Sequence, residues 1–201
     1  MNSGTNGTNT TTLQRTAAVI ALLAAVFALY YRTLDNPFVW DDQFLILKNY
    51  FIHNLKNIGG LFTQAYFTQP VEISYRPVAT LTYMIDYALW RTQPQGWHFF
   101  NVTLHFLNSL LVYALAARAA RRAWLALGLA LLFALHPVNT EAINAVTFRE
   151  DPLCLFFMLA SLLIYIGYSE GRARGALRLA ASIVLYAVSY THLTLPTIYS
   201  V

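Results

Sequence analysis

Charged residues are scarce in this chain. Of its 201 residues only 11% are Asp, Glu, Lys or Arg, whereas 57% are hydrophobic. A soluble domain has about 25% charged residues, so this deficit excludes a water-soluble domain and indicates a membrane protein. Cysteine is also nearly absent: Cys154 stands alone, which excludes an internal disulfide bond and a cysteine-ligated metal site. No basic cluster interleaved with aromatic residues is present, so we expect no nucleic-acid partner.

Long apolar runs predict the membrane spans. They lie at about residues 17–34, 97–117, 123–137, 152–168 and 176–187. With its flanks, the first run reaches the ~20 residues that a spanning helix needs. A cleaved signal peptide is the alternative for this run, but Tyr30, Tyr31 and Arg32 lack the small residues of a cleavage site. The expected fold class is therefore an all-α polytopic membrane protein.

The two ends of the chain differ in composition from its middle. Residues 1–16 are mostly Asn, Ser, Gly and Thr, which predicts a disordered cytoplasmic tail. From about Val188 the chain resembles a translated sequencing adapter, so residues 188–201 are expected to be an artefactual tail. Residues 17–187 would then form the amino-terminal part of a longer transmembrane domain, and the chain would be a truncated piece.

Arginine-rich segments predict the orientation in the membrane. Arg15, the group Arg118–Arg122 and the group Arg172–Arg178 lie in the tail and in two short loops, and such segments stay in the cytoplasm. The loops at 32–95 and 136–151 then lie outside. Arginine outnumbers lysine by 11 to 2 and alanine is abundant, which favours a bacterial origin. We expect an inner-membrane protein whose outer loops face the periplasm.

The long outer loop is expected to carry two short helices, at residues 54–67 and 76–89. In the second, apolar residues recur at helical spacing and Pro77 suits the first helical position. Short amphipathic helices between two spans usually lie on the membrane interface.

Polar residues share one face of the second span. Asn101, His105 and Asn108 follow at i, i+4 and i+7. Polar groups at membrane depth face the bundle interior or a wet cavity. Packing through interhelical hydrogen bonds and a role in ligand binding both remain open at this point.

Carboxylates and arginines gather on the predicted outer side, where every acidic residue except Glu170 falls. A carboxylate beside a low-dielectric wall can act as a general base. An arginine can neutralise a phosphate through paired hydrogen bonds. Together they suit displacement at a sugar carbon whose leaving group is a lipid phosphate. Adjacent aspartates such as Asp41 and Asp42 are often simply solvated, however, so their spacing alone leaves catalysis open.

Several motifs in order resemble one family. They are Phe38–Asp42 with Ile46 and Asn49, Tyr75–Pro77 with Leu81–Tyr83 and Asp86–Tyr87, Trp97–His98 with Asn101, His105 and Asn108, and Leu132–Pro137 with Thr140–Ala142. This set resembles the transmembrane, tetratricopeptide-containing O-mannosyltransferases and their bacterial relatives, which are polytopic glycosyltransferases of the GT-C fold. The resemblance runs from about Thr33 to Tyr168. No tetratricopeptide repeat of 34 residues is visible in the chain.

The resemblance implies a polyprenyl-phosphate sugar donor, with mannose as the candidate sugar, and a hydroxyl of a protein or glycan acceptor on the outer side. Asp41 or Asp42 would take the acceptor proton, with inversion at the sugar carbon. Arg76 and Arg149 are the candidates for the donor phosphate, although Phe148 and Glu150 depart from the family pattern around Arg149.

Other residues are expected to shape the acceptor site or to support it. They are His136, Glu141, Asp151 and His105. No metal site is predicted, and a divalent cation stays open because two aspartates alone do not complete an oxygen-ligand set.

Two other functions remain open from the sequence. A transporter would need intramembrane charges or broken helices in paired halves, and no internal repeat is visible. A non-catalytic membrane scaffold would carry the aspartate pair incidentally.

Overall fold

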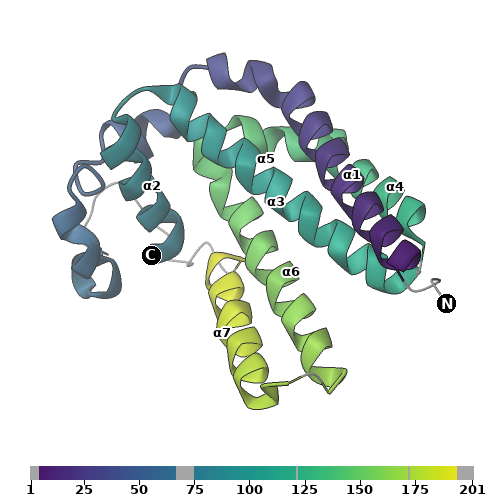
Figure 1. Cartoon of the computed structure of the whole chain (residues 1–201). Helices are drawn as coiled ribbons and strands as arrows, with labels where there is room; N and C mark the ends of the chain where they lie inside the picture. Colours follow the sequence, from purple (N-terminus) through teal and green to yellow (C-terminus); the bar gives the residue numbers. More distant parts are fainter. Residues whose placement is uncertain (1–4, 67–74, 121, 172, 194–201) are drawn as a thin grey trace.

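The structure is a computed structural model that describes residues 5–66, 75–120, 122–171 and 173–193. All regular elements in these residues are helices (Figure 1), so the all-α prediction is confirmed. Three helical segments are long and apolar enough to cross a membrane: Thr12–Asp35, Pro94–Ala120 and Val146–Ser169. A fourth span exists if Ala123–Ala134 and Pro137–Asn144, which meet at a bend of 46°, count as one. The chain is therefore a multi-pass membrane protein.

The fifth predicted span, 176–187, is longer in the structure than expected. It corresponds to helix α7 (Gly175–Leu193), which packs against α6 (Glu150–Ser169). The described apolar part, Gly175–Thr191, is about 26 Å long at ~1.5 Å per residue. The helix continues past Ala187, where we expected the span to dissolve, and residues 194–201 of the expected artefactual tail lie outside the described residues.

The first helix also begins earlier than expected. Helix α1 (Thr5–Tyr30) includes most of the predicted disordered tail, and only residues 1–4 of that tail lie outside the described part. The apolar run that follows forms a helix, and residues before it can extend that helix. Extension is favourable because adding a residue to a formed helix is much easier than nucleating a new one.

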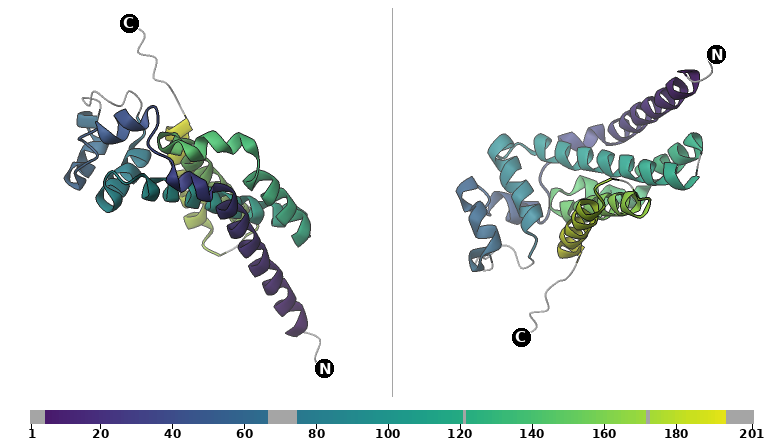
Figure 2. Two further views of the ribbon diagram at one scale, coloured as in Figure 1. Left: turned by 90° about the horizontal axis from the view of Figure 1, so that it is seen from above. Right: turned by 60° about the horizontal axis from the view of Figure 1, so that its bottom comes forward.

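Helices α1, α3 (Pro94–Ala120) and α4 (Ala123–Ala134) lie side by side, while α6 and α7 diverge from them as a second pair (Figure 1). Small residues allow the first group to pack closely. Ala126, Ala130 and Ala134 of α4 are fully buried against a core that includes Leu22 and Val26 of α1. Figure 2 shows that the first turns of α1 stand away from α3 and α4.

The outer loop forms a second apolar core on the start of α3. It contains η1 (Tyr31–Asp35), η2 (Gln43–Leu47), η3 (Leu55–Phe62), η4 (Gln64–Tyr66) and α2 (Pro77–Trp90). The helix predicted at 76–89 is therefore confirmed. The one predicted at 54–67 is instead two 3₁₀ segments, and the Gly59–Gly60 pair explains this because glycine weakens an α-helix. Ile52, Leu61, Met84 and Trp97 are fully buried in this core.

A second outer segment returns over the same place. It runs from η5 (Pro137–Asn139) through α5 (Thr140–Asn144) and η6 (Val146–Arg149) into α6. Both α5 and η6 contact α3. The two outer segments thus meet at one end of the bundle.

The polar face of α3 holds these elements together. Asn101, His105 and Asn108 are at most 2% exposed. Their side-chain N–H groups donate to the carbonyl oxygens of Ala145 (3.2 Å), Ala134 (2.9 Å) and Pro152 (2.8 Å), respectively. Ala134 lies at the end of α4 and Ala145 lies between α5 and η6, where carbonyls lack helical partners. Pro152 lies in the first turn of α6. The face therefore points into the bundle and serves packing.

Candidate functional site

The two adjacent aspartates lie in opposite environments. Asp42 is fully buried, and its Oδ1 accepts a hydrogen bond from the backbone N–H of Thr147 at 2.9 Å. Its Oδ2 accepts from the backbone N–H of Val39 at 3.1 Å. Asp41 is exposed on the surface. Asp42 therefore joins the two outer segments, whereas the carboxylate of Asp41 remains accessible.

The backbone before the pair explains this split. Trp40 has a φ of 45° and its side chain is 70% exposed. A positive φ is unfavourable for a residue with a Cβ, and such strain often marks a functional site. Upstream, Nε2–H of buried His98 on α3 donates to the carbonyl of Asn36 at 3.1 Å, which fixes the entry to the turn.

Asp41 belongs to a small group of charges with Arg76 and Glu150, which we call the outer charge cluster. Arg76 Nη1 contacts Glu150 Oε1 at 2.5 Å, and the two side chains are 32% and 10% exposed. Asp41 lies within electrostatic range of Glu150. Pro77 at the start of α2 and the hydroxyl of Tyr66, which accepts from the backbone N–H of Arg76 at 3.2 Å, place the arginine. The cluster thus offers a carboxylate and a partly exposed guanidinium on one surface.

Arg149 occupies the interior instead. It is fully buried and forms an ion pair with Asp86 of α2, Nη1 to Oδ2, at 2.6 Å. Its Nε donates to Asn101 Oδ1 at 2.7 Å and its Nη2 to the carbonyl of Trp97 at 3.1 Å. Its guanidinium also lies over the ring of Phe100, 4.2 Å from the centroid. Arg149 therefore connects α2, α3 and η6.

The ion pair also changes the acidity of its carboxyl group. Burial raises the pKa of Asp86, and the positive charge of Arg149 opposes this rise. A buried charge pair is tolerated only when its remaining hydrogen-bonding groups have partners, and Asn101 and Trp97 supply them to the guanidinium here.

Glu141 lines a cavity beside the aspartate motif. The cavity has a volume of about 320 Å³ and is lined by Asn36, Pro37, Val39, Trp40, Glu141, Asn144 and Ala145. Its wall is mainly apolar, and Glu141 is exposed. The structure thus brings Glu141 next to the motif, although 100 residues separate Glu141 from Asp41 in the sequence.

The other predicted residues are more scattered. His136 is exposed, and its Nδ1 accepts from the backbone N–H of Val138 at 3.2 Å, which caps η5. His105 is buried in the bundle and packs edge-on against Tyr30. Asp151 is exposed and borders a small cavity of about 100 Å³ that also touches His105. Within the described part of the chain, no group of three or more His, Cys, Asp or Glu residues could hold a metal ion.

Sequence reasoning missed Glu150 and Asp86 as partners of the two arginines. Glu150 was noted only as a departure from the family pattern, and its position next to Arg149 gives no hint of its pairing with Arg76. Asp86 had a signal, since it lies one turn after Thr82 on a predicted helix that also buries Tyr83. A carboxylate on a buried helical face requires a positive partner.

Comparison with known proteins finds relatives among the protein O-mannosyl-transferases. It is 32% identical over 152 residues to the protein O-mannosyl-transferase TMTC3 of Mus musculus, covering 73% of this chain and 16% of that protein. It is 34% identical over 169 residues to TMTC1 of Homo sapiens, covering 80% and 19%. It is 30% identical over 178 residues to Tmtc1 of Drosophila melanogaster, covering 86% and 21%.

These matches confirm the resemblance seen in the motifs. The chain spans about a fifth of the length of these relatives. No family model and no solved structure matches it. Over this segment the chain is therefore a distant homologue of the TMTC protein O-mannosyl-transferases.

Proposed function

We propose that the protein carrying this chain transfers a sugar, mannose by its homology, from a polyprenyl-phosphate donor to the hydroxyl of a protein or glycan acceptor at the outer end of the bundle. The observation that carries the proposal is the outer charge cluster, in which exposed Asp41 interacts electrostatically with Glu150, the ion-pair partner of Arg76. This surface offers one group for each half of the reaction, a base for the acceptor and a cation for the donor.

Asp41 is our candidate for the base. Both oxygens of Asp42 accept backbone hydrogen bonds, so removing Asp42 from its place would leave two amides unsatisfied. The side chain of Asp41 is exposed, so it is accessible to an acceptor and is not committed to a buried contact as Asp42 is. In the reaction, the acceptor oxygen bonds to the sugar carbon as the bond from that carbon to the phosphate oxygen breaks. The acceptor proton passes to Asp41, and the lipid phosphate leaves with the electron pair.

Arg76 is our candidate for the donor phosphate. Its side chain is 32% exposed, and a guanidinium can hold a phosphate through two parallel hydrogen bonds. Arg149 was the other candidate, but a phosphate could reach it only if Asp86 and Asn101 withdrew. We therefore assign Arg149 to the support of the site.

The cavity beside Trp40 is our candidate for the acceptor. Its volume of about 320 Å³ suits a short side chain with its backbone, and Glu141 can hydrogen-bond to polar groups there. Trp40 contributes to this cavity while its chain neighbour Asp41 contributes to the charge cluster. An acceptor in the cavity would thus have the base at its edge.

The transporter alternative loses its support in this structure. It depended on a wet polar face along the second span, and Asn101, His105 and Asn108 instead bond to backbone carbonyls within the bundle. A scaffold without catalysis remains the rival function, and it predicts no loss of transfer from any change at Asp41.

The test is sugar transfer by the full-length protein in membranes, with a polyprenyl-phosphate-mannose donor and a hydroxyl-containing acceptor peptide. We expect Asp41→Asn to lower the transfer rate by roughly 10²–10⁴-fold, the range for loss of a general base, with donor binding unchanged. Asp35→Asn is the matched control, because Asp35 is an exposed aspartate of the same loop. Full transfer by correctly inserted Asp41→Asn protein would rule out the proposed mechanism.

A further inference from the structure

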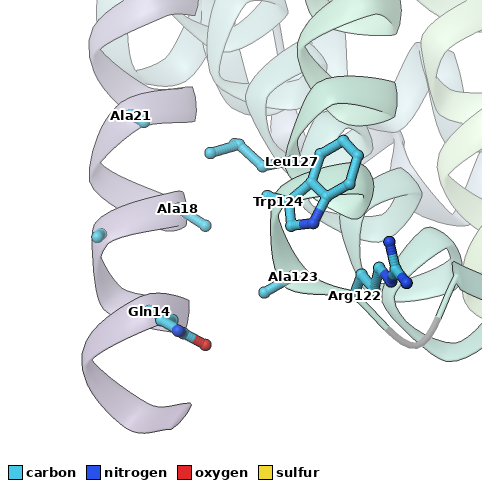
Figure 3. A pocket seen from close by; sticks show the side chains of 8 residues that line it. Gln14, Ala18, Ala21, Arg122, Ala123, Trp124 and Leu127 are labelled. Atoms are coloured by element: carbon cyan, nitrogen blue, oxygen red, sulfur yellow. The ribbon is translucent and has the colours of Figure 1, made fainter. Parts of the chain in front are cut away.

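A groove lies between α1 and α4 at the end of the bundle opposite the outer charge cluster. Figure 3 shows Gln14, Ala18 and Ala21 of α1 opposite Ala123 and Leu127 of α4, and Trp124 and Arg122 complete the α4 side. The cavity has a volume of about 510 Å³, and Ala17 completes its lining. The groove is thus lined mainly by apolar side chains, four of them alanines, with one arginine.

The shape of the groove suits a hydrocarbon chain. Three alanines on α1 and Ala123 on α4 leave an open channel where larger side chains would fill the space. From Gln14 to Ala21 the groove runs for about 10 Å at ~1.5 Å per residue, the length of roughly eight methylene groups. Trp124 is 66% exposed beside it, and tryptophan favours the boundary between lipid tails and headgroups.

The arginines at this end of the bundle have no acidic residue beside them within α1, α3 and α4. Arg15, Arg118 and Arg122 all lie at this end, and residues 5–30 and 94–134, which form α1, α3 and α4, contain no Asp or Glu. Arg15 and Arg118 border a second cavity of about 430 Å³ on the neighbouring side of α1. A bound anionic group would therefore balance a positive charge that α1, α3 and α4 do not balance themselves.

We propose that this groove binds one anionic phospholipid, with an acyl chain between α1 and α4 and the headgroup phosphate on Arg122. Basic pockets between transmembrane helices on the cytoplasmic side are a known form of lipid site. The bound chain fills the cavity between Gln14–Ala21 of α1 and Ala123–Leu127 of α4. This site is separate from the proposed transfer reaction and lies at the other end of the bundle.

The test counts phosphatidylglycerol molecules bound to the purified full-length protein by native mass spectrometry, with phosphatidylcholine as the neutral competitor. We expect one phosphatidylglycerol to be retained in preference to phosphatidylcholine. Arg122→Gln should weaken this binding about fivefold, the effect of roughly one arginine at an anionic surface. Ala21→Phe should abolish it while leaving the charge unchanged, because the ring fills the groove.

Arg174→Gln is the control for general attraction, since Arg174 is an exposed arginine in the turn before α7, away from the groove. The proposal is overturned if Arg174→Gln and Arg122→Gln weaken binding equally, or if Ala21→Phe binds normally. It is also overturned if a cysteine at position 21 cross-links to another segment of the full-length protein, because a helix would then occupy the groove.

Discussion

At the scale of single residues, neighbouring aspartates of one motif perform different tasks. Asp42 is a buried acceptor for two backbone N–H groups, one of them on Thr147, 105 residues away. Asp41, its direct neighbour, is exposed. The strained Trp40, with its φ of 45°, precedes them and sets the direction of the turn. Losing either aspartate should therefore reduce transfer, but for different reasons that a stability measurement separates.

We predict that Asp42→Ala destabilises the protein, whereas Asp41→Ala does not. Leaving the buried N–H of Thr147 without an acceptor costs about 1–3 kcal/mol, and the half-buried N–H of Val39 adds less. An exposed carboxylate contributes within about 0.5 kcal/mol. Thermal unfolding in detergent, followed by circular dichroism, measures the difference. Equal melting temperatures for the two variants would contradict the assignment of Asp42 to the fold.

At the scale of elements, Arg149 and Arg76 each connect α2 to another helix, one in the interior and one nearer the surface. Arg149 holds α2 to α3 from the interior through Asp86, Asn101 and Trp97. Arg76 joins the start of α2 to the start of α6 from the surface through Glu150. The interior contact is shielded from water, and the surface contact is open to a ligand.

We predict that Arg149→Ala lowers the free energy of unfolding by about 3–5 kcal/mol, because Asp86 is left buried without its partner. The double variant Arg149→Leu with Asp86→Leu should recover part of this loss, since no unpaired charge then remains. Unfolding by denaturant measures all three proteins. If the double variant is no better than Arg149→Ala, the ion pair is not the source of the effect.

Arg76→Ala should behave in the opposite way. The Arg76 side chain is 32% exposed but its partner Glu150 is buried, so the loss of stability should be smaller than for Arg149→Ala. Its Michaelis constant for the polyprenyl-phosphate donor should rise at least tenfold, because a phosphate contact is lost. Arg91→Ala serves as the control, since Arg91 is an exposed arginine at the other end of α2. An unchanged Michaelis constant would remove Arg76 from the donor site.

At the scale of the whole molecule, charge is divided between the two ends. The described aspartates and glutamates other than Glu170 lie in the outer segments or at their junctions with the helices, and Arg15, Arg118 and Arg122 lie at the other end. Segments rich in arginine stay in the cytoplasm, so we predict that the proposed transfer site faces the outer side of the membrane.

Cysteine labelling in intact cells tests this orientation. In a Cys154→Ser background, cysteines at Gln43 and Thr140 should react with an impermeant thiol reagent, and a cysteine at Glu170 should not. All three positions are exposed in the structure, so reactivity reports the side of the membrane and not burial. Labelling at position 170 alone would reverse the orientation and with it the place of the transfer reaction.

The sequence by itself determined the class of the protein and the outline of its helices. Hydropathy depends on consecutive residues, so the spans at α1, α3 and α6 and the helix from Pro77 could be predicted from local composition. The 3₁₀ segments at Leu55–Phe62 and Gln64–Tyr66 could not, because neighbouring elements decide the form of such weak helices.

Only the tertiary structure decided the roles of the charged residues. Asp41 and Asp42 have the same chemistry and nearly the same place in the chain, and only the approach of Thr147 separates them. From the sequence, Arg149 was a candidate phosphate ligand. In the structure it forms an ion pair with Asp86 of α2. Glu150 forms an ion pair with Arg76, which lies 74 positions earlier in the sequence. A carboxylate or guanidinium acquires its function from partners that folding brings together, and their sequence separation leaves no local pattern to detect.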